Sequence, residues 1–261
     1  MNLAYYVVDA FATKVFEGNP AAVFILPEWL PENLMQKIAI ENNLSETAFA
    51  VKETDSYSLR WFTPDREIDL CGHATLATAF VLFHYYEPQR TSIVFQTKYS
   101  GQLRVTKEGE LLSLDFPAIR PEKTPILPIY EEAIGAKINE AYLARDLFFV
   151  LDNETQIQQL TPNFSLIKTF EQGVGVIVTA PGETVDFVSR TFFPKLTIDE
   201  DPVCGSAHSN LIPYWSSRLN KTQMTAKQLS ARGGFLECTL ADERVIIGGK
   251  GVLYAKGTCF L

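Results

Sequence analysis

The pattern of apolar and polar residues predicts a chain built mostly of short strands. Runs rich in Val, Ile, Tyr and Phe, bounded by Gly, Pro, Asn or Ser, are typical of strands. In the first half such runs cover 3–10, 21–26, 45–51, 57–62, 92–96, 101–107 and 111–116. In the second half they cover 146–150, 175–179, 185–193, 229–232, 235–240 and 244–248. The tail 251–261 is one more predicted strand, and its return to the first half is left open.

Helical periodicity predicts one apolar helix in each half. The run 72–86 is almost uncharged, so we expect it to be buried on most sides. A second apolar helix is predicted at 206–219. Shorter helices are predicted at 31–42, 130–138 and 154–160. Each half therefore combines many strands with one buried helix, which indicates an α+β fold with a mixed or barrel-like sheet.

A sequence motif occurs twice, at matching places in the two halves. RWFTP at 60–64 precedes DLCGHAT at 69–75, and RTFFP at 190–194 precedes DPVCGSA at 201–207. The offset is about half of the 261-residue chain, whereas solenoid repeats run over about 20–50 residues. The repeat predicts an internal duplication that forms two domains facing a cleft. We place them at 1–118 and 119–250, joined by a proline-rich linker.

Composition and charge exclude several functional classes. The net charge of −8 argues against nucleic acid and against an anionic membrane surface as partners. No apolar run reaches the roughly 18 residues of a membrane span, and we expect a cytoplasmic protein. Four cysteines lie far apart, without CxxC or HExxH spacing, so we predict neither disulfides nor a metal. Phosphate-binding glycine motifs are missing too, which removes the usual signals of nucleotide binding.

The repeated glycines indicate a site for a small anion. Gly72 and Gly205 stand at the starts of the two apolar helices, where unpaired N–H groups and the helix dipole favour a carboxylate. His73, Ser206 and His208 lie in the first turns and would add side-chain hydrogen bonds. The alternative is simple helix capping with small residues for packing.

Three further residues could carry the chemistry. Glu46 begins an otherwise apolar strand, and burial raises a carboxyl pKa toward the range that suits proton transfer. Cys71 and Cys204 occupy equivalent places at helix starts, where a thiol can act as acid or base. Both thiols could instead be buried small apolar side chains.

These segments resemble the phenazine-biosynthesis PhzF-like family, within the diaminopimelate epimerase-like superfamily. The resemblance rests on segments that span nearly the whole chain in order: GNP at 18–20, SETAF at 45–49, CGHAT at 71–75, EDPVCGSAH at 200–208 and RGG at 232–234. It implies two pseudo-symmetric domains, each a β-barrel-like sheet around a central helix. It also implies a cofactor-free site in the cleft between them, and a homodimer is kept as the candidate oligomer.

The resemblance also implies residue roles. Glu46 matches the family's catalytic glutamate, which shuttles a proton during an isomerisation. Positions that hold the substrate match a set from both motifs, namely Gly72, His73, Asp201, Gly205 and Ser206. We therefore expect a cofactor-independent isomerase acting on a small carboxylate, with a biosynthetic role like that of the phenazine enzyme.

Two other functions remain open at this stage. Cys71 and Cys204 could form a two-base pair in an amino-acid racemase or epimerase, because diaminopimelate epimerase uses two cysteines and this chain keeps both. The same scaffold could also serve a non-catalytic protein that binds a small molecule or a protein partner.

Overall fold

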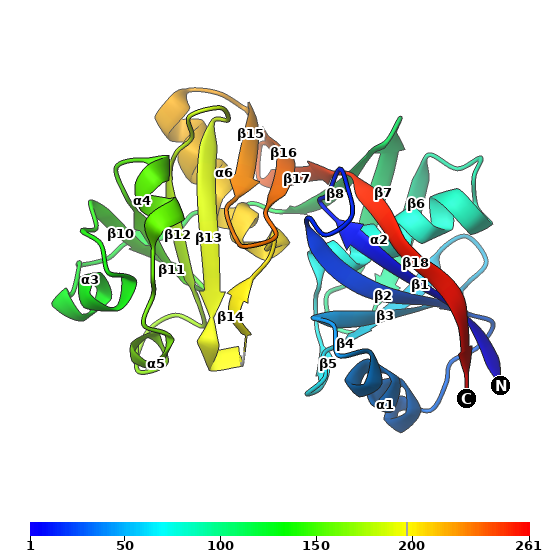
Figure 1. Cartoon of the computed structure of the whole chain (residues 1–261). Helices are drawn as coiled ribbons and strands as arrows, with labels where there is room; N and C mark the ends of the chain where they lie inside the picture. The colour runs from blue at the N-terminus through cyan, green and yellow to red at the C-terminus, as the bar shows by residue number, and fades with distance from the viewer. Residues whose placement is uncertain (197) are drawn as a thin grey trace. The chain divides into compact units, whose positions relative to one another are not determined.

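The structure, a computed structural model, describes residues 1–196 and 198–261 and separates into two compact units (Figure 1). The first unit comprises Met1–Phe116 together with Ile247–Leu261, and the second comprises Pro117–Ile246. The predicted boundaries lay at 118 and 250. The second boundary falls earlier because Gly249 already packs in the first unit, with its Cα facing the Phe11 ring closely.

The first unit pairs its strands in a mixed sheet. β2 runs parallel to β3, β3 antiparallel to β4, and β4 parallel to β6. The final strand pairs antiparallel with β1, from Asn2 opposite Phe260 to Ala10 opposite Gly251. The elements are β1 (Asn2–Ala10), β2 (Asn19–Leu26), α1 (Glu32–Asn42), β3 (Glu46–Lys52), β4 (Tyr57–Phe62), β5 (Glu67–Ile68), α2 (Gly72–Val81), η1 (Leu82–Tyr86), β6 (Ser92–Thr97), β7 (Gln102–Glu108), β8 (Leu111–Pro117) and β18 (Gly251–Phe260).

The helix α2 is the centre of this unit. It packs against β1, β2, β3 and β18, and eight of its residues are buried. The predicted helix ran to Tyr86, but the α-helical part ends at Val81 and a π-helical turn follows. The wider turn closes with the Glu87 N–H donating to the Leu82 carbonyl (2.7 Å). It lets both Tyr85 and Tyr86 contact the ring of Tyr6.

The second unit repeats this order of pairing. β11 runs parallel to β12, β12 antiparallel to β13, and β13 parallel to β15, with α6 following the short strand β14 as α2 follows β5. Its elements are β9 (Glu122–Lys123), α3 (Pro128–Ile134), β10 (Glu140–Leu143), β11 (Leu147–Val150), α4 (Glu154–Gln159), α5 (Phe164–Ile167), β12 (Val176–Pro181), β13 (Phe187–Phe193), η2 (Pro194–Leu196), β14 (Ile198–Asp201), α6 (Gly205–Leu219), β15 (Gln223–Gln228), β16 (Gly234–Ala241) and β17 (Arg244–Gly249).

One predicted strand of this unit is wrong. Residues 229–232 form a turn rather than a strand, in which the Gly233 N–H donates to Ser230 Oγ (3.0 Å). Gly233 has a φ of +67°, a conformation that favours glycine. The strand lies earlier, at Gln223–Gln228, where polar residues alternate with buried ones and the apolar signal is weak.

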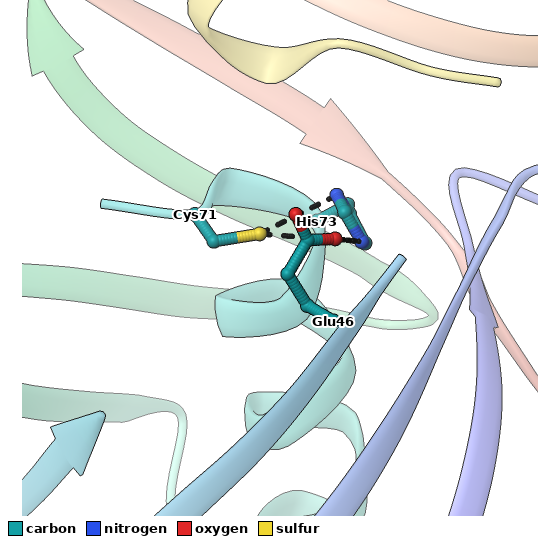
Figure 2. A group of neighbouring side chains, drawn as sticks. All are labelled: Glu46, Cys71 and His73. Carbon is teal, nitrogen blue, oxygen red and sulfur yellow. Dashed lines mark hydrogen bonds and ion pairs between the residues drawn. The ribbon is translucent and has the colours of Figure 1, made fainter. Parts of the chain in front are cut away.

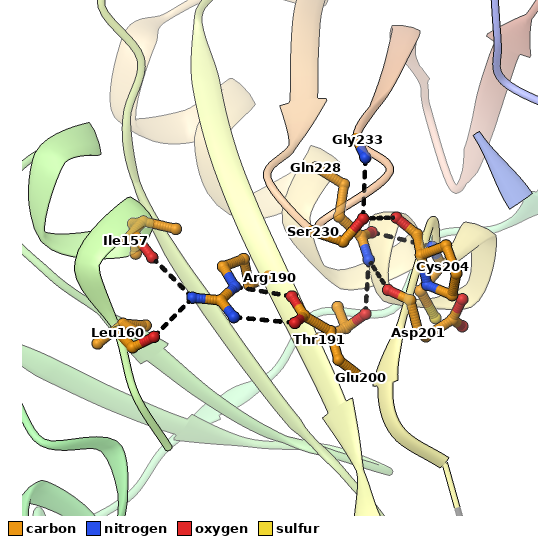
Figure 3. A network of polar contacts seen from close by, with 11 residues as sticks. Ile157, Leu160, Arg190, Thr191, Glu200, Asp201, Cys204, Gln228, Ser230 and Gly233 are labelled. Carbon is orange, nitrogen blue, oxygen red and sulfur yellow. Dashed lines mark hydrogen bonds and ion pairs between the residues drawn. The ribbon is translucent and has the colours of Figure 1, made fainter. Parts of the chain in front are cut away.

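The R-x-F part of the repeat forms the same clamp in both units. Arg60 donates from Nε to Glu67 on the next strand (2.6 Å), and Arg190 donates in the same way to Glu200 (2.7 Å; Figure 3). In each unit the guanidinium carbon lies 5.2 Å from the centre of the ring two residues on, Phe62 or Phe192. The clamp therefore fixes the short strand that leads into each motif.

Arg190 also donates from Nη1 to the carbonyls of Ile157 (3.3 Å) and Leu160 (2.9 Å), so this arginine links α4 to the sheet. Among the described residues, no helix combines the length and apolar character needed to cross a membrane.

Removal of the second clamp tests its contribution to stability. Arg190→Met should lower the free energy of unfolding by about 2–4 kcal/mol, because Glu200 and two carbonyls lose a charged donor in a largely buried place. Arg104→Met is the control, since Arg104 is exposed, and it should change stability by less than about 0.5 kcal/mol. Urea unfolding followed by tryptophan fluorescence measures both. Equal stabilities of the two variants would contradict this role.

Candidate active site

The first copy of the motif brings a carboxylate and an imidazole together in a buried place. Glu46 is the first residue of β3 and is 7% exposed. His73 lies in the first turn of α2, and its Nε2 is 2.8 Å from Glu46 Oε2 (Figure 2). Cys71 caps the same helix, with Sγ 3.5 Å from His73 Nδ1. The structure therefore brings Glu46, Cys71 and His73 together, beside Gly72 at the start of α2.

Asn19 completes this group, and sequence reasoning gave it no role. Its Nδ2 lies 3.1 Å from His73 Nδ1. An amide side chain offers both a donor and an acceptor, so it can pair with the imidazole in either protonation state. The preceding Gly18 has a φ of +66°, and a Cβ there would lie 2.1 Å from the Ala10 carbonyl oxygen. Only glycine fits this turn, and the turn delivers Asn19 to the site.

The electrostatics of this group favour a protonated imidazole. Burial lowers the pKa of His73, but the neighbouring Cys71 and Glu46 raise it, and the net pKa lies well above the usual value. Burial raises the pKa of Cys71, and the charge of Glu46 raises it further. The thiol therefore keeps its proton near neutral pH and carries no charge there, so Glu46 is the charged neighbour that favours the protonated ring of His73.

The second copy has different partners. Cys204 caps α6, and its Sγ lies 3.3 Å from Ser206 Oγ. Arg145 donates from Nη2 to Ser206 Oγ (3.0 Å), a contact that sequence reasoning missed. Burial and then the charge of Asp201 raise the pKa of Cys204. This thiol is also protonated at neutral pH.

Gln228 holds the loop of the second motif in place. It accepts from the Cys204 N–H (2.9 Å) and donates to the Asp201 carbonyl (2.6 Å; Figure 3). Asp201, Cys204, Gly205 and Ser206 are thus brought together in the second unit, whereas Glu46, Gly72 and His73 belong to the first.

His208 differs from the prediction. We expected its side chain to add a hydrogen bond for a ligand, but it is 0% exposed, and its Nδ1 donates to the Cys204 carbonyl (2.8 Å). Burial lowers the pKa of His208 to about 4, so the ring is neutral. Thr75 makes the equivalent bond in the first unit, from Oγ1 to the Cys71 carbonyl (2.5 Å). His208 therefore supports the helix start.

The first group also contains atoms that a metal ion could use. Glu46, Cys71 and His73 each offer one ligand atom, and these atoms lie within 4.8 Å of one another. Oxygen, sulfur and nitrogen are ligands that zinc accepts. The sequence did not suggest this cluster, because Glu46 lies far from the other two along the chain. A metal would have to displace the proton of Cys71, and the absence of a metal stays a prediction.

Comparisons with known proteins identify relatives over the whole chain. Residues 8–257 match the family described as phenazine biosynthesis-like protein. An uncharacterized isomerase of Pseudomonas aeruginosa is 49% identical over 261 residues, and the match covers 100% of both chains. The crystal structure of a phenazine biosynthesis protein of the PhzF family from Enterococcus faecalis is 65% identical, with a TM-score of 0.99 over 100% of both chains.

A more distant match concerns the fold alone. The crystal structure of a hydroxyproline epimerase from Agrobacterium vitis is 12% identical, with a TM-score of 0.63 over 98% of this chain and 92% of that one. The predicted α+β fold of the diaminopimelate epimerase type is therefore confirmed.

The pH dependence of stability tests the charged pair. The folded chain holds a proton on His73 that the unfolded chain releases near pH 6.5, so this contribution is complete below about pH 6.5 and is lost as pH rises through the raised folded-state pKa. Glu46→Gln removes a charge that favours the proton and should flatten the curve in this range. Urea unfolding from about pH 6 to 9 measures it. An equally steep fall in Glu46→Gln would contradict the assignment.

Proposed function

Because the chain belongs to the phenazine biosynthesis-like protein family, we propose that it is a cofactor-independent isomerase that moves a proton on a small carboxylate-bearing substrate. The observation that carries this proposal is the buried pair of Glu46 and His73, which are 2.8 Å apart. A carboxylate held against an imidazolium can take a proton from one carbon atom and give a proton back to another.

The proposed reaction needs only these groups. Glu46 removes a proton from a carbon atom of the substrate, and the electron pair of the broken C–H bond forms a new double bond. The existing double bond shifts, and Glu46 returns the proton to another carbon, so no net oxidation occurs. His73 stays protonated in this scheme and offsets the charge of Glu46 before and after the transfer.

Substrate binding is assigned to both copies of the motif. The backbone N–H groups of Gly72 and His73 at the start of α2 suit a carboxylate, because helix N-termini bind anions. Gly205 and Ser206 offer the same groups at the start of α6, and Asp201 would accept a hydrogen bond from an amino or hydroxyl group.

A two-cysteine racemase is the second candidate, and one observation favours it. Cys71 and Cys204 occupy the same capping position before α2 and α6. Burial, however, raises the pKa of both thiols, and only the thiolate accepts a proton. A protein that binds a ligand without catalysis has no need of the buried Glu46–His73 pair. A non-catalytic binding function is therefore the least supported of the three.

Hydrogen exchange distinguishes these functions. The enzyme is incubated in D₂O with a panel of amino acids and cyclic acids, and deuterium uptake on carbon is measured by mass spectrometry. Glu46→Gln should slow uptake by about 10²–10⁴-fold, the range typical of a general acid or base. Cys71→Ala and Cys204→Ala should keep most of the activity.

Glu154→Gln is the matched control, because Glu154 is also 7% exposed but bonds to the Glu183 N–H in the second unit. It should leave uptake unchanged. Loss of uptake in both cysteine variants, with Glu46→Gln close to the wild type, would establish the racemase instead.

A further inference from the structure

The registers of the two sheets show which residue of the second unit replaces Glu46. In the first unit, Arg60 pairs with Phe49, and Glu46 lies three residues before Phe49. In the second unit, the equivalent Arg190 pairs with Val178, and Gly175 lies three residues before Val178. The second copy therefore carries glycine at the position of the proposed base.

Gly175 has no room for a side chain. A Cβ at this position would lie 2.2 Å from Cδ1 of Phe193. Phe193 follows the R-x-F clamp where the first unit has Thr63, and its ring fills the space that an acidic side chain would need. Because Gly175 cannot be replaced without moving this ring, the second copy has lost the carboxylate.

The same ring supports Arg145. The Arg145 guanidinium carbon lies 5.7 Å from the centre of the Phe193 ring. Its Nε and Nη2 donate to Oδ2 of Asp146, at 3.0 and 2.5 Å. The Asp146 side chain is fully buried, and its other oxygen accepts from the Gly175 N–H (3.0 Å). The glycine, the ring and the aspartate together fix the orientation of the guanidinium.

Arg145 lies in the second unit at the place where the first unit has the turn that supplies Asn19. β2 pairs Ala21 with Glu46, and β11 continues the same parallel register with Leu147 opposite Val176. Arg145 therefore corresponds to Pro20, next to Asn19. Arg145 bonds to Ser206, which takes the place of His73 in the repeat. A cation and a hydroxyl thus stand where the first unit has an amide and an imidazole.

One end of this guanidinium is available for a ligand. The Arg145 side chain is 49% exposed, and its Nη1 makes no hydrogen bond with the described residues. Burial lowers the pKa of Arg145, but its neighbours, Asp146 first among them, raise it by more than burial lowers it. The guanidinium therefore stays positively charged. A guanidinium held by Asp146 and Ser206 at Nε and Nη2 keeps the two N–H groups of Nη1 to donate to a carboxylate.

We propose that Arg145 binds the acid group of the substrate. The second copy of the motif lacks a base, and its Arg145 and Ser206 suit the recognition of an anion. This assignment rests on the proposed function for the identity of the substrate as a carboxylate, but Arg145 is tested by binding rather than by turnover. If Arg145 has this role, every good substrate must carry an acid group.

Calorimetric titration of the full chain with benzoate and with neutral benzamide tests the proposal, since the two probes differ only in the acid group. The wild type should prefer benzoate, and Arg145→Gln should lose at least about tenfold in benzoate affinity, equivalent to about 1.4 kcal/mol. Arg145→Lys keeps a charge beside Asp146 for folding but lacks paired donors, and it should bind benzoate several-fold more weakly.

Arg218→Gln is the matched control, because Arg218 lies in the same unit, is 52% exposed and is paired with Glu140. It should bind benzoate like the wild type. Equal benzoate affinity in the wild type and both Arg145 variants, or no preference for benzoate over benzamide, would overturn the proposal. Glu46→Gln should still bind benzoate, because Arg145 is unchanged in that variant. If deuterium uptake by Glu46→Gln stayed at the wild-type rate, this would contradict the proposed isomerase but not the role of Arg145.

Discussion

An arginine placed over a phenylalanine ring and bonded to a glutamate of the next strand determines where each motif begins. Arg60 and Arg190 make this contact with nearly equal distances in the two units. β5 has only two residues, so ladder hydrogen bonds alone would hold it weakly. The bidentate, planar contact supplies the missing constraint, and a lysine could not reproduce it. The path of the chain into both helix starts depends on this pair.

On that shared frame the two copies keep the geometry of the helix start and differ in its chemistry. The cysteine cap and the hydrogen bond to its carbonyl are kept, although Thr75 makes that bond in one unit and His208 in the other. The residues that differ in chemistry face the helix start: Glu46 and His73 in the first unit, Gly175 and Ser206 in the second. Duplication thus preserved the parts that define geometry and freed the parts that define reactivity.

The sequence predicted much of this and missed what depends on pairing across the sheet. The repeated R-x-F-x-P and C-G blocks indicated the two helices, and the apolar strand around Glu46 indicated the carboxylate; the family resemblance is confirmed. Arg145 carries no local signal, and GNP at 18–20 gave Asn19 no role, because only the strand register brings these two residues to a helix start. β5 was missed because two residues show no periodicity.

The closing strand has a consequence for the order in which the protein is made. β18 is synthesised after the whole of the second unit, yet it pairs with β1, which precedes that unit, and the Leu261 N–H donates to the Met1 carbonyl (2.8 Å). The second unit is therefore inserted within the first, and all its residues leave the ribosome before the first unit can be completed. Until then β1 exposes unpaired backbone groups along one edge, a known risk for aggregation. The unit whose first strands are made before the other unit is therefore the unit that is completed after it.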